Sequence, residues 1–273
     1  MKLYVLDCGR IENDLGCLIG LPHQATIFDK NPKAEWVQVP IWTVLIEQDG
    51  KRILLDTACN PDSQNRWHNS LWIRTPYYAT QEQLFPNVLK RMNLTPKDID
   101  YVVMSHLHVD HGGCLELFAG TKAKVIVHED EFTNAMKLYA INKEMGPYIR
   151  KDIEHWLAAD LNWQLIPNDS PDFELVNGVT VLNLGPGHCF GMLGLRVDLK
   201  NTGTVILPSD ALNVKENMGP PVVTPSSVYD SIGYRKTANR IFQLAQKTNG
   251  QVWFGHDIKQ FDTLITSDHG FYD

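Results

Sequence analysis

The predicted fold class is α/β, with two mixed β-sheets packed face to face and flanked by helices, an αββα sandwich. Two observations predict it. Short runs rich in β-branched and aromatic residues occur in both halves of the 273-residue chain, and segments with helical periodicity separate and follow them. The hydrophobic content of 43%, with 21% charged residues, is typical of a globular protein with a sizeable core. We therefore expect residues 1–273 to form a single domain.

The first half of the chain predicts strands followed by a helix. The strands are expected at residues 2–7, 39–47 and 52–56. A loop reaching to about residue 35 follows the first strand, and Gln48–Lys51 is typical of a hairpin turn. Residues 80–92 carry apolar side chains at helical spacing, with Thr80 as the N-cap. Pro86 lies inside that pattern and predicts a kink or a break.

An aromatic stretch at residues 67–78 has no clean helix or strand period, which predicts a loop packed over an apolar surface. Three interpretations stay open for it: a satellite core, a subunit interface in a homodimer, or a lid over a substrate. His68, within this stretch, is not expected to bind a metal.

The second half alternates strands and helices. The strands are expected at residues 101–104, 123–127, 163–166, 173–175, 179–184, 194–198, 204–207 and 251–254. Helices separated by Gly146 and Pro147 are expected within 129–160, and a long amphipathic helix over 231–247. His128 ends a strand and is expected to be a structural hydrogen-bonding group.

Charge and cysteine usage exclude several classes of protein. A formal net charge of −7 argues against nucleic acid as a partner, because nucleic-acid-binding proteins usually carry a basic face. No apolar stretch approaches the roughly 20 residues that span a bilayer, so no membrane association is expected. The start of the chain has the pattern of a strand rather than of a signal peptide. Five scattered cysteines without a CxxC pair predict a reduced, cytoplasmic protein.

Metal-ligating side chains are concentrated directly after the strand predicted at residues 101–104. His106, His108, Asp110 and His111 lie within a six-residue window, and Gly112-Gly113 follows. In an extended segment, residues 106, 108 and 110 would project to one side, leaving His111 for a second, adjacent centre. Neutral imidazole and carboxylate are the ligands that zinc prefers where thiolate is absent. The segment therefore predicts a metal site.

Four ligands on one loop cannot complete two metal centres, so further ligands are expected at later strand ends. His188, Asp210 and His256 each follow an apolar run, in turns that contain Gly or Asp. Asp210 could bridge two cations with its two oxygens, whereas each imidazole serves one. Asp56, at the end of the strand predicted over 52–56, has two open interpretations: a turn-capping residue or a support of the metal loop.

Together, the segments His106–His111, Pro186–His188, Ser209–Ala211 and Gly255–Asp257 resemble the signature of the metallo-β-lactamase superfamily. The similarity covers nearly the whole chain and is greatest to the N-acyl-homoserine lactonase branch. The resemblance implies that one zinc ion is held by His106, His108 and His188. It implies that Asp110, His111 and His256 hold the other, with Asp210 bridging the two. Cys189 follows a ligand directly but is expected to be a small buried residue.

Two positions depart from the pattern of that branch. Asn213 stands three residues after the bridging Asp210, where the branch has a tyrosine that hydrogen-bonds the lactone carbonyl. Ala58 stands where a glycine is usual. The segment at 129–165 is also longer than in the smallest relatives.

The resemblance implies a dinuclear zinc hydrolase that opens a lactone ring with metal-activated water, the expected substrate being an N-acyl-homoserine lactone of quorum signalling. Asp110 or Asp210 would help to protonate the leaving alkoxide, and Asn213 would orient the carbonyl. The aromatic stretch, with Trp36 and Met218, is expected to supply an apolar wall for an acyl chain.

Other functions were weighed against this one. Another lactone or ester, of the γ-butyrolactone or pyridoxolactone type, is the first alternative. A glyoxalase II-like thioesterase lacks support because no basic C-terminal patch is evident, and the iron-dependent redox branch usually has Glu where His108 stands. The acidic balance disfavours a phosphodiesterase. The presence of all seven ligands disfavours a non-catalytic binding protein.

Overall fold

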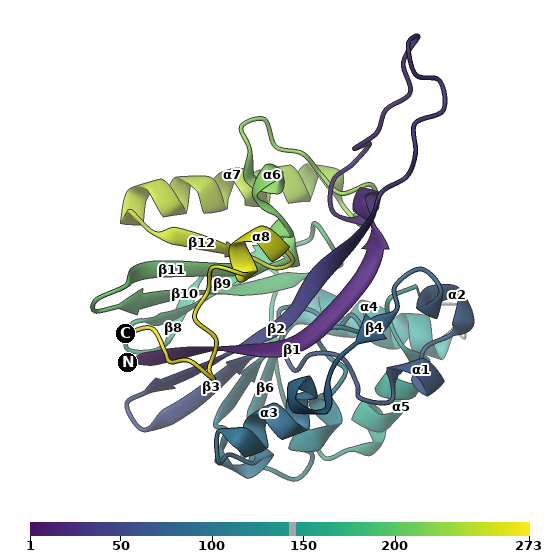
Figure 1. The fold of residues 1–273 in the computed structure, drawn as a ribbon. Coiled ribbons are helices and arrows are strands. Elements are labelled where there is room, and N and C mark those ends of the chain that lie inside the picture. The colour runs from purple at the N-terminus through teal and green to yellow at the C-terminus, as the bar shows by residue number, and fades with distance from the viewer. Residues whose placement is uncertain (142–145) are drawn as a thin grey trace.

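The computed structural model describes residues 1–141 and 146–273, and it forms two β-sheets packed face to face (Figure 1). The seven-stranded sheet has the order β4-β1-β2-β3-β5-β6-β7 and the five-stranded sheet the order β12-β11-β10-β9-β8. The strands are β1 (Lys2–Asp14), β2 (Trp36–Gln48), β3 (Lys51–Leu55), β4 (Tyr77–Tyr78), β5 (Tyr101–Val103), β6 (Lys124–His128), β7 (Asn162–Ile166), β8 (Phe173–Val176), β9 (Val179–Gly185), β10 (Met192–Leu199), β11 (Gly203–Ser209) and β12 (Gln251–Phe254).

Helices cover the outer face of each sheet. Those on the seven-stranded side are α1 (Ser63–Arg66), α2 (Asn69–Trp72), α3 (Phe85–Arg91), α4 (Glu129–Ala140) and α5 (Arg150–Ala158). Those in the second half are α6 (Lys215–Met218), α7 (Ser231–Thr248) and α8 (Ile258–Phe261). Short 3₁₀ helices are η1 (Leu15–Cys17), η2 (Gln81–Gln83), η3 (Pro96–Asp98), η4 (Leu115–Phe118) and η5 (Asp210–Leu212). The αββα arrangement predicted from the sequence is confirmed.

Three apolar clusters hold these layers together. The cluster between the sheets takes alternate residues of both, such as Val44 and Ile46 from β2 and Leu193 and Leu195 from β10. A second cluster lies under the helices of the first half, and a third lies between α7 and the five-stranded sheet. This alternation of buried side chains with period two is why the strands could be predicted from sequence.

The long hairpin of β1 and β2 exceeds the predicted strands. Pairing runs from Lys2 opposite Glu47 to Asp14 opposite Trp36, with a bulge between Asp7 and Arg10. The prediction of a loop from residue 8 is therefore wrong for residues 8–14. The hydrophobic alternation of the first strand is interrupted at the bulge, but pairing with β2 continues beyond it. Residues 20–35 then project from the body as an arm (Figure 1), and Phe28 within it is 93% exposed.

The break predicted at Pro86 is confirmed, and one local prediction needs correction. The helical pattern of residues 80–92 divides into η2 and α3, and Pro86 lies in the first turn of α3, where its missing N–H costs nothing. Thr80 caps the preceding η2. The aromatic stretch contains α2 and β4 instead of forming one loop. Trp67 and Tyr77 are buried in the cluster below, as expected of a satellite core.

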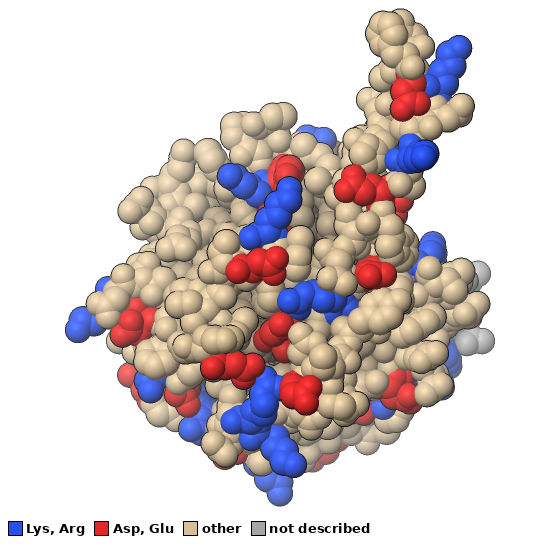
Figure 2. All heavy atoms as spheres, in the orientation of Figure 1, with Lys and Arg blue, Asp and Glu red and all other residues tan. Residues whose placement is uncertain are grey.

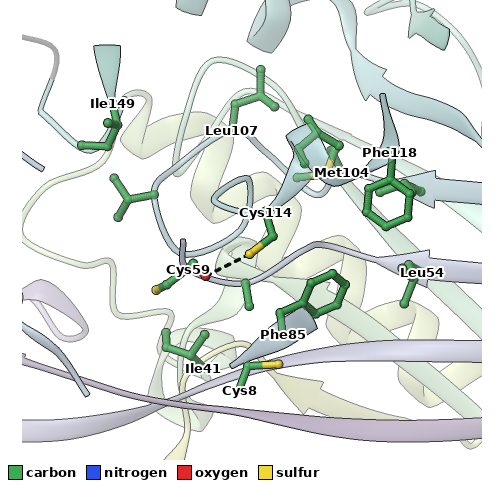
Figure 3. Close-up of a cluster of buried hydrophobic side chains, with 14 of the residues drawn as sticks. Cys8, Ile41, Leu54, Cys59, Phe85, Met104, Leu107, Cys114, Phe118 and Ile149 are labelled. Atoms are coloured by element: carbon green, nitrogen blue, oxygen red, sulfur yellow. Dashed lines mark hydrogen bonds between the residues drawn. The ribbon is translucent and has the colours of Figure 1, made fainter. Parts of the chain in front are cut away.

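All five cysteines are free thiols, and four of them are buried. Figure 3 shows Cys8, Cys59 and Cys114 among apolar side chains, with the Cys114 thiol donating to the Cys59 carbonyl at 3.3 Å. Burial raises the pKa of the Cys59 and Cys114 thiols well above the ordinary value. Protonated thiols are poor metal ligands, so these cysteines pack as small apolar residues.

The surface carries both signs of charge. Lys and Arg side chains are interspersed with Asp and Glu on the face shown in Figure 2. Among the described residues, none of the helices combines the length and apolar character needed to cross a bilayer.

Candidate metal centre

The metal loop, residues 104–113, leaves the carboxyl end of β5, a strand paired in parallel with β3 and β6. The loop is not extended. It turns at His108, whose carbonyl accepts hydrogen bonds from the N–H groups of His111 (3.1 Å) and Gly112 (2.9 Å). The expectation that residues 106, 108 and 110 share one side is therefore wrong. The turn separates Asp110 from the first two histidines and places it beside His111.

The later ligands approach the loop from the five-stranded sheet. His188 follows β9, and Asp210 and His256 follow β11 and β12, which run parallel with Ser209 opposite Phe254. Gly255 permits this close approach. A Cβ at that position would lie 2.8 Å from the Ser209 carbonyl carbon and 2.9 Å from Asp210 Oδ1. The glycine is thus required for Asp210 and His256 to lie side by side.

All seven predicted ligands converge, and they form two groups that share Asp210. The ligand atoms within each of these groups lie within 4.8 Å of one another: His106, His108 and His188; and Asp110, His111 and His256. Asp210 lies between the groups. Its Oδ1 is 3.1 Å from His256 Nε2 and 3.3 Å from His111 Nε2, and its Oδ2 is 3.4 Å from His188 Nε2.

Two features of these side chains fit bound cations. The Nε2 atoms of His106 and His111 are buried without a hydrogen-bond partner among the described residues. Nitrogen atoms of His108 and His188 face each other at 3.1 Å. Buried polar atoms normally have partners, and imidazole nitrogens and carboxylate oxygens converging on a common point are the donor set of a divalent transition metal.

The two groups differ in their protonation. Burial lowers the pKa of His106, His108 and His188, and neighbouring histidines lower it further, so these imidazoles are neutral. In the other group, burial alone would lower the pKa of His256, but the carboxylates of Asp210 and Asp110 outweigh it and raise it to about 10. A cation that binds there displaces a proton.

Asp110 and Asp210 are both ionised. Burial would raise the pKa of each carboxyl group, but nearby histidines, His111 and His256 foremost, hold both well below their usual range.

Hydrogen bonds on the opposite ring nitrogens orient the second group. The Nδ1 of His111 lies 2.8 Å from Asp56 Oδ2, and the Nδ1 of His256 lies 3.0 Å from the Pro40 carbonyl. Asp56 also accepts from the backbone N–H and the hydroxyl of Ser105, both at 2.7 Å. Of its two interpretations, the structure favours support of the metal loop, since the contact fixes the tautomer and orientation of His111.

The backbone beside the ligands is strained. Asp56 (φ 67°), Ala58 (φ 56°) and Ser209 (φ 51°) all adopt the left-handed region, which favours glycine. This conformation explains why a glycine is usual at position 58. Such strain is common where a fold positions functional side chains.

A pocket of about 380 Å³ opens onto the ligands. Asn213 lines it and is nearly fully buried, with its Oδ1 lacking a hydrogen-bond partner among the described residues. Leu71 and Thr75 from the aromatic stretch also line the pocket. Trp36 and Met218 are not among the lining residues, because Trp36 is half-exposed and bonds to Glu12, and Met218 packs on the core beneath α7.

One wall of the pocket was not predicted from the sequence. Tyr148, Phe190 and Tyr229 form a chain of ring contacts, Tyr148 to Phe190 at 5.6 Å and Phe190 to Tyr229 at 4.7 Å between centroids. The three come from separate segments with no shared motif. The position of Phe190 directly after His188-Cys189 was the one available signal.

The histidines expected to be structural are structural. His68 caps α2, accepting from Leu71 N–H at 3.1 Å, and His128 caps α4, accepting from Asp130 N–H at 3.1 Å. Cys189 is buried, and burial raises the pKa of its thiol well above the ordinary value, as expected of a residue that is not a ligand.

The fold and the site together define a class of protein. It is the class of metal-dependent hydrolases with paired candidate cation sites at the edge of an αββα sandwich. The metallo-beta-lactamase superfamily model matches residues 36–207. The chain belongs to this superfamily.

Relatives cover the whole chain. An N-acyl homoserine lactonase, AiiB, from Rhizobium rhizogenes strain K84 is 40% identical over 275 residues, covering 100% of this chain and 99% of the relative. AiiB from Agrobacterium fabrum is equally similar, at 40% identity. A solved N-acyl homoserine lactone hydrolase with N-hexanoyl-L-homoserine bound at its catalytic metal centre superimposes with a TM-score of 0.81 at 27% identity, covering 100% of this chain and 98% of that one.

Proposed function

We propose that this protein opens the ring of N-acyl-homoserine lactones by hydrolysis, and so degrades quorum-sensing signals. The convergence of seven candidate metal ligands, five of which line an open pocket, carries the proposal. The lactonases that are 40% identical over their whole length support the choice of substrate.

The metals are proposed to be two zinc ions. One would be held by His106, His108 and His188, and the other by Asp110, His111 and His256, with Asp210 shared. The donor set supports zinc, because imidazole and carboxylate without thiolate suit zinc at a catalytic site. Bound zinc supplies a water of lowered pKa as the nucleophile and a Lewis acid for the carbonyl.

The remaining steps are assigned to side chains that line the pocket. Asn213 would hydrogen-bond the lactone carbonyl through its amide, in place of a tyrosine hydroxyl. The leaving alkoxide needs a proton, and a carboxylate oxygen of Asp110 or Asp210, ionised at the start, can take this proton from the attacking water and pass it on. The aromatic wall and Leu71 would exclude water from the acyl chain. Two further points remain predictions: residues 1–273 form one domain, and the protein is a cytoplasmic homodimer.

The test is a panel of substrates with zinc-loaded protein. Butanoyl-, hexanoyl- and dodecanoyl-homoserine lactone are compared with γ-butyrolactone, a pyridoxolactone, an acyl-glutathione thioester and a phosphodiester, with Asp210→Ala as the inactive control. We expect ring opening of homoserine lactones far above the control. Activity confined to the other substrates would reject the quorum-signal substrate and leave the hydrolase.

A further inference from the structure

Glu131 is a fully buried carboxylate that is neither a metal ligand nor a pocket residue. It lies in the first turn of α4 with none of its surface exposed. A buried carboxylate is costly unless several hydrogen bonds satisfy it. Its partners therefore indicate what it does.

Hydrogen bonds reach Glu131 from two separate segments, and a third segment, at Gly191, packs beside the start of its helix. Its Oε1 accepts from the Leu107 N–H at 2.9 Å. The Tyr148 hydroxyl donates to the same carboxylate, at 2.9 Å from Oε1 and 3.1 Å from Oε2. Burial raises the pKa of Glu131, and the neighbouring Leu107, Cys189, Tyr148 and Gly191 lower it in part.

Each of these segments carries or contacts at least one ligand of the three-histidine group. Leu107 lies between His106 and His108, and Cys189 and Gly191 follow His188 in the chain. The Tyr148 ring meets the His108 ring edge-on, at 4.7 Å between centroids.

Packing supports the same connection. A Cβ at Gly191 would lie 2.0 Å from His128 Nδ1, so the N-terminus of α4 sits directly on the backbone that follows His188. The structure gives Glu131 no hydrogen bond to Asp110, His111 or His256.

We propose that Glu131 is the positioning residue of the three-histidine metal site: its carboxylate holds Leu107, between His106 and His108, together with Tyr148, while the start of its helix packs against the backbone that follows His188. This inference rests on the metal ligands of the proposed function. The proposed role of Glu131 differs from that of Asp56. Asp56 contacts the ring of a ligand, whereas Glu131 contacts the backbone between two ligands and a neighbouring side chain.

The test measures zinc affinity directly, by competition with a chromophoric chelator, in wild type, Glu131→Gln and Asp152→Asn. An amide of the same size has one acceptor oxygen, so at least one donor would face an NH₂ group in Glu131→Gln. Asp152 is the matched control, since it is also a buried helical carboxylate but binds Arg66 at 2.9 Å and no ligand-bearing segment.

We expect Glu131→Gln to lower the affinity for one of the two zinc ions about 10- to 100-fold and to leave the affinity for the other unchanged. Asp152→Asn should leave both affinities unchanged. Tyr148→Phe removes one donor and keeps the carboxylate, so it should lower the affinity for the same zinc ion about threefold. This variant serves as the test if Glu131→Gln does not fold.

Wild-type affinity for both ions in Glu131→Gln and Tyr148→Phe would overturn the inference, as would equal weakening in Asp152→Asn. The proposed function can fail separately. A protein that binds two zinc ions with this pattern but opens no homoserine lactone would keep the role of Glu131 and reject the substrate.

Discussion

His106, His108 and His188 bring three neutral imidazoles together, whereas Asp110, His111 and His256 combine a carboxylate with two imidazoles whose pKa values are raised. The second group also receives Asp210 Oδ1 within 3.3 Å of both its histidines. The two adjacent sites thus differ in the charge that their side chains present to a bound cation. We expect them to bind zinc unequally, with the carboxylate-bearing group the tighter, because unlike charges attract strongly in a buried site.

The groups also differ in how they are held. Asp56 and the Pro40 carbonyl bond directly to ligand rings in the carboxylate-bearing group, and Glu131 holds the segments around the three histidines. In the carboxylate-bearing group both histidine rings have a direct contact, whereas in the three-histidine group the Ser105 hydroxyl lies 3.0 Å from His106 Nδ1 and Glu131 holds the backbone at Leu107.

Removing the shared carboxylate should have the largest effect. Asp210→Ala takes away a carboxylate that lies within 3.4 Å of histidines in both groups, so both sites lose negative charge. We expect kcat/KM for hexanoyl-homoserine lactone to fall by more than about 100-fold, beyond the range typical of outer-shell residues, and bound zinc to decrease. Activity within tenfold of wild type, with two zinc ions retained by elemental analysis, would contradict the shared role.

Asp56→Asn should weaken the carboxylate-bearing site most, because Asp56 contacts the His111 ring directly and reaches the His106 ring only through the Ser105 hydroxyl, 3.0 Å from His106 Nδ1. The amide cannot accept from Ser105 and His111 as the carboxylate does, so the His111 ring loses its orientation. We expect affinity for one zinc ion to fall about 10- to 100-fold. The double variant Asp56→Asn with Glu131→Gln tests this difference between the sites, because it should lower the affinity for both zinc ions. If one ion stays tight in the double variant, the two carboxylates serve the same site.

Asn213→Ala should leave both sites intact and affect substrate alone. The side chain lines the pocket beside the ligands and belongs to neither group. Loss of one hydrogen bond to the carbonyl predicts a fall in kcat/KM of about tenfold with zinc content unchanged. Asn213→Asp, of the same shape but without the N–H₂ donor, is the matched variant and should be impaired at least as much. Loss of zinc in either variant would place Asn213 among the residues that support the metals.

The smallest effect concerns a carboxylate outside both groups. Burial raises the pKa of Asp152 to about 6, and its contact with Arg66 lowers it in part. Because the folded state holds this proton more tightly than the unfolded chain, its contribution to stability is complete at low pH and is lost as pH rises through 6. Between pH 4 and 7, the zinc-free wild type should lose up to about 3 kcal/mol relative to Asp152→Asn. Denaturant unfolding of both proteins checks this, and parallel curves would refute it.

The seven side chains that converge could be predicted from the sequence because each follows a strand end with a local signal. His106 to His111 form a dense motif, and His188, Asp210 and His256 each follow a recognisable apolar run. The fold class followed from alternating burial. In contrast, Glu131 reads as an ordinary acidic residue in the first turn of a helix, and its role depends on three contacts distant in the chain. Tyr148 and Phe190 meet only after folding, so no local pattern could predict the wall they form.

The projecting arm has a consequence for handling the protein. Residues 23–31 are exposed throughout, and Lys30 and Lys33 lie in the arm. Exposed loop tips are preferred sites of proteolysis. We expect trypsin to cut there first, with the short amino-terminal fragment staying attached, because β1 remains paired with β2 along its length. The nicked protein should elute as one species and separate into two only in denaturant. An immobilisation tag inserted in this arm would sit apart from the strands that hold the ligands.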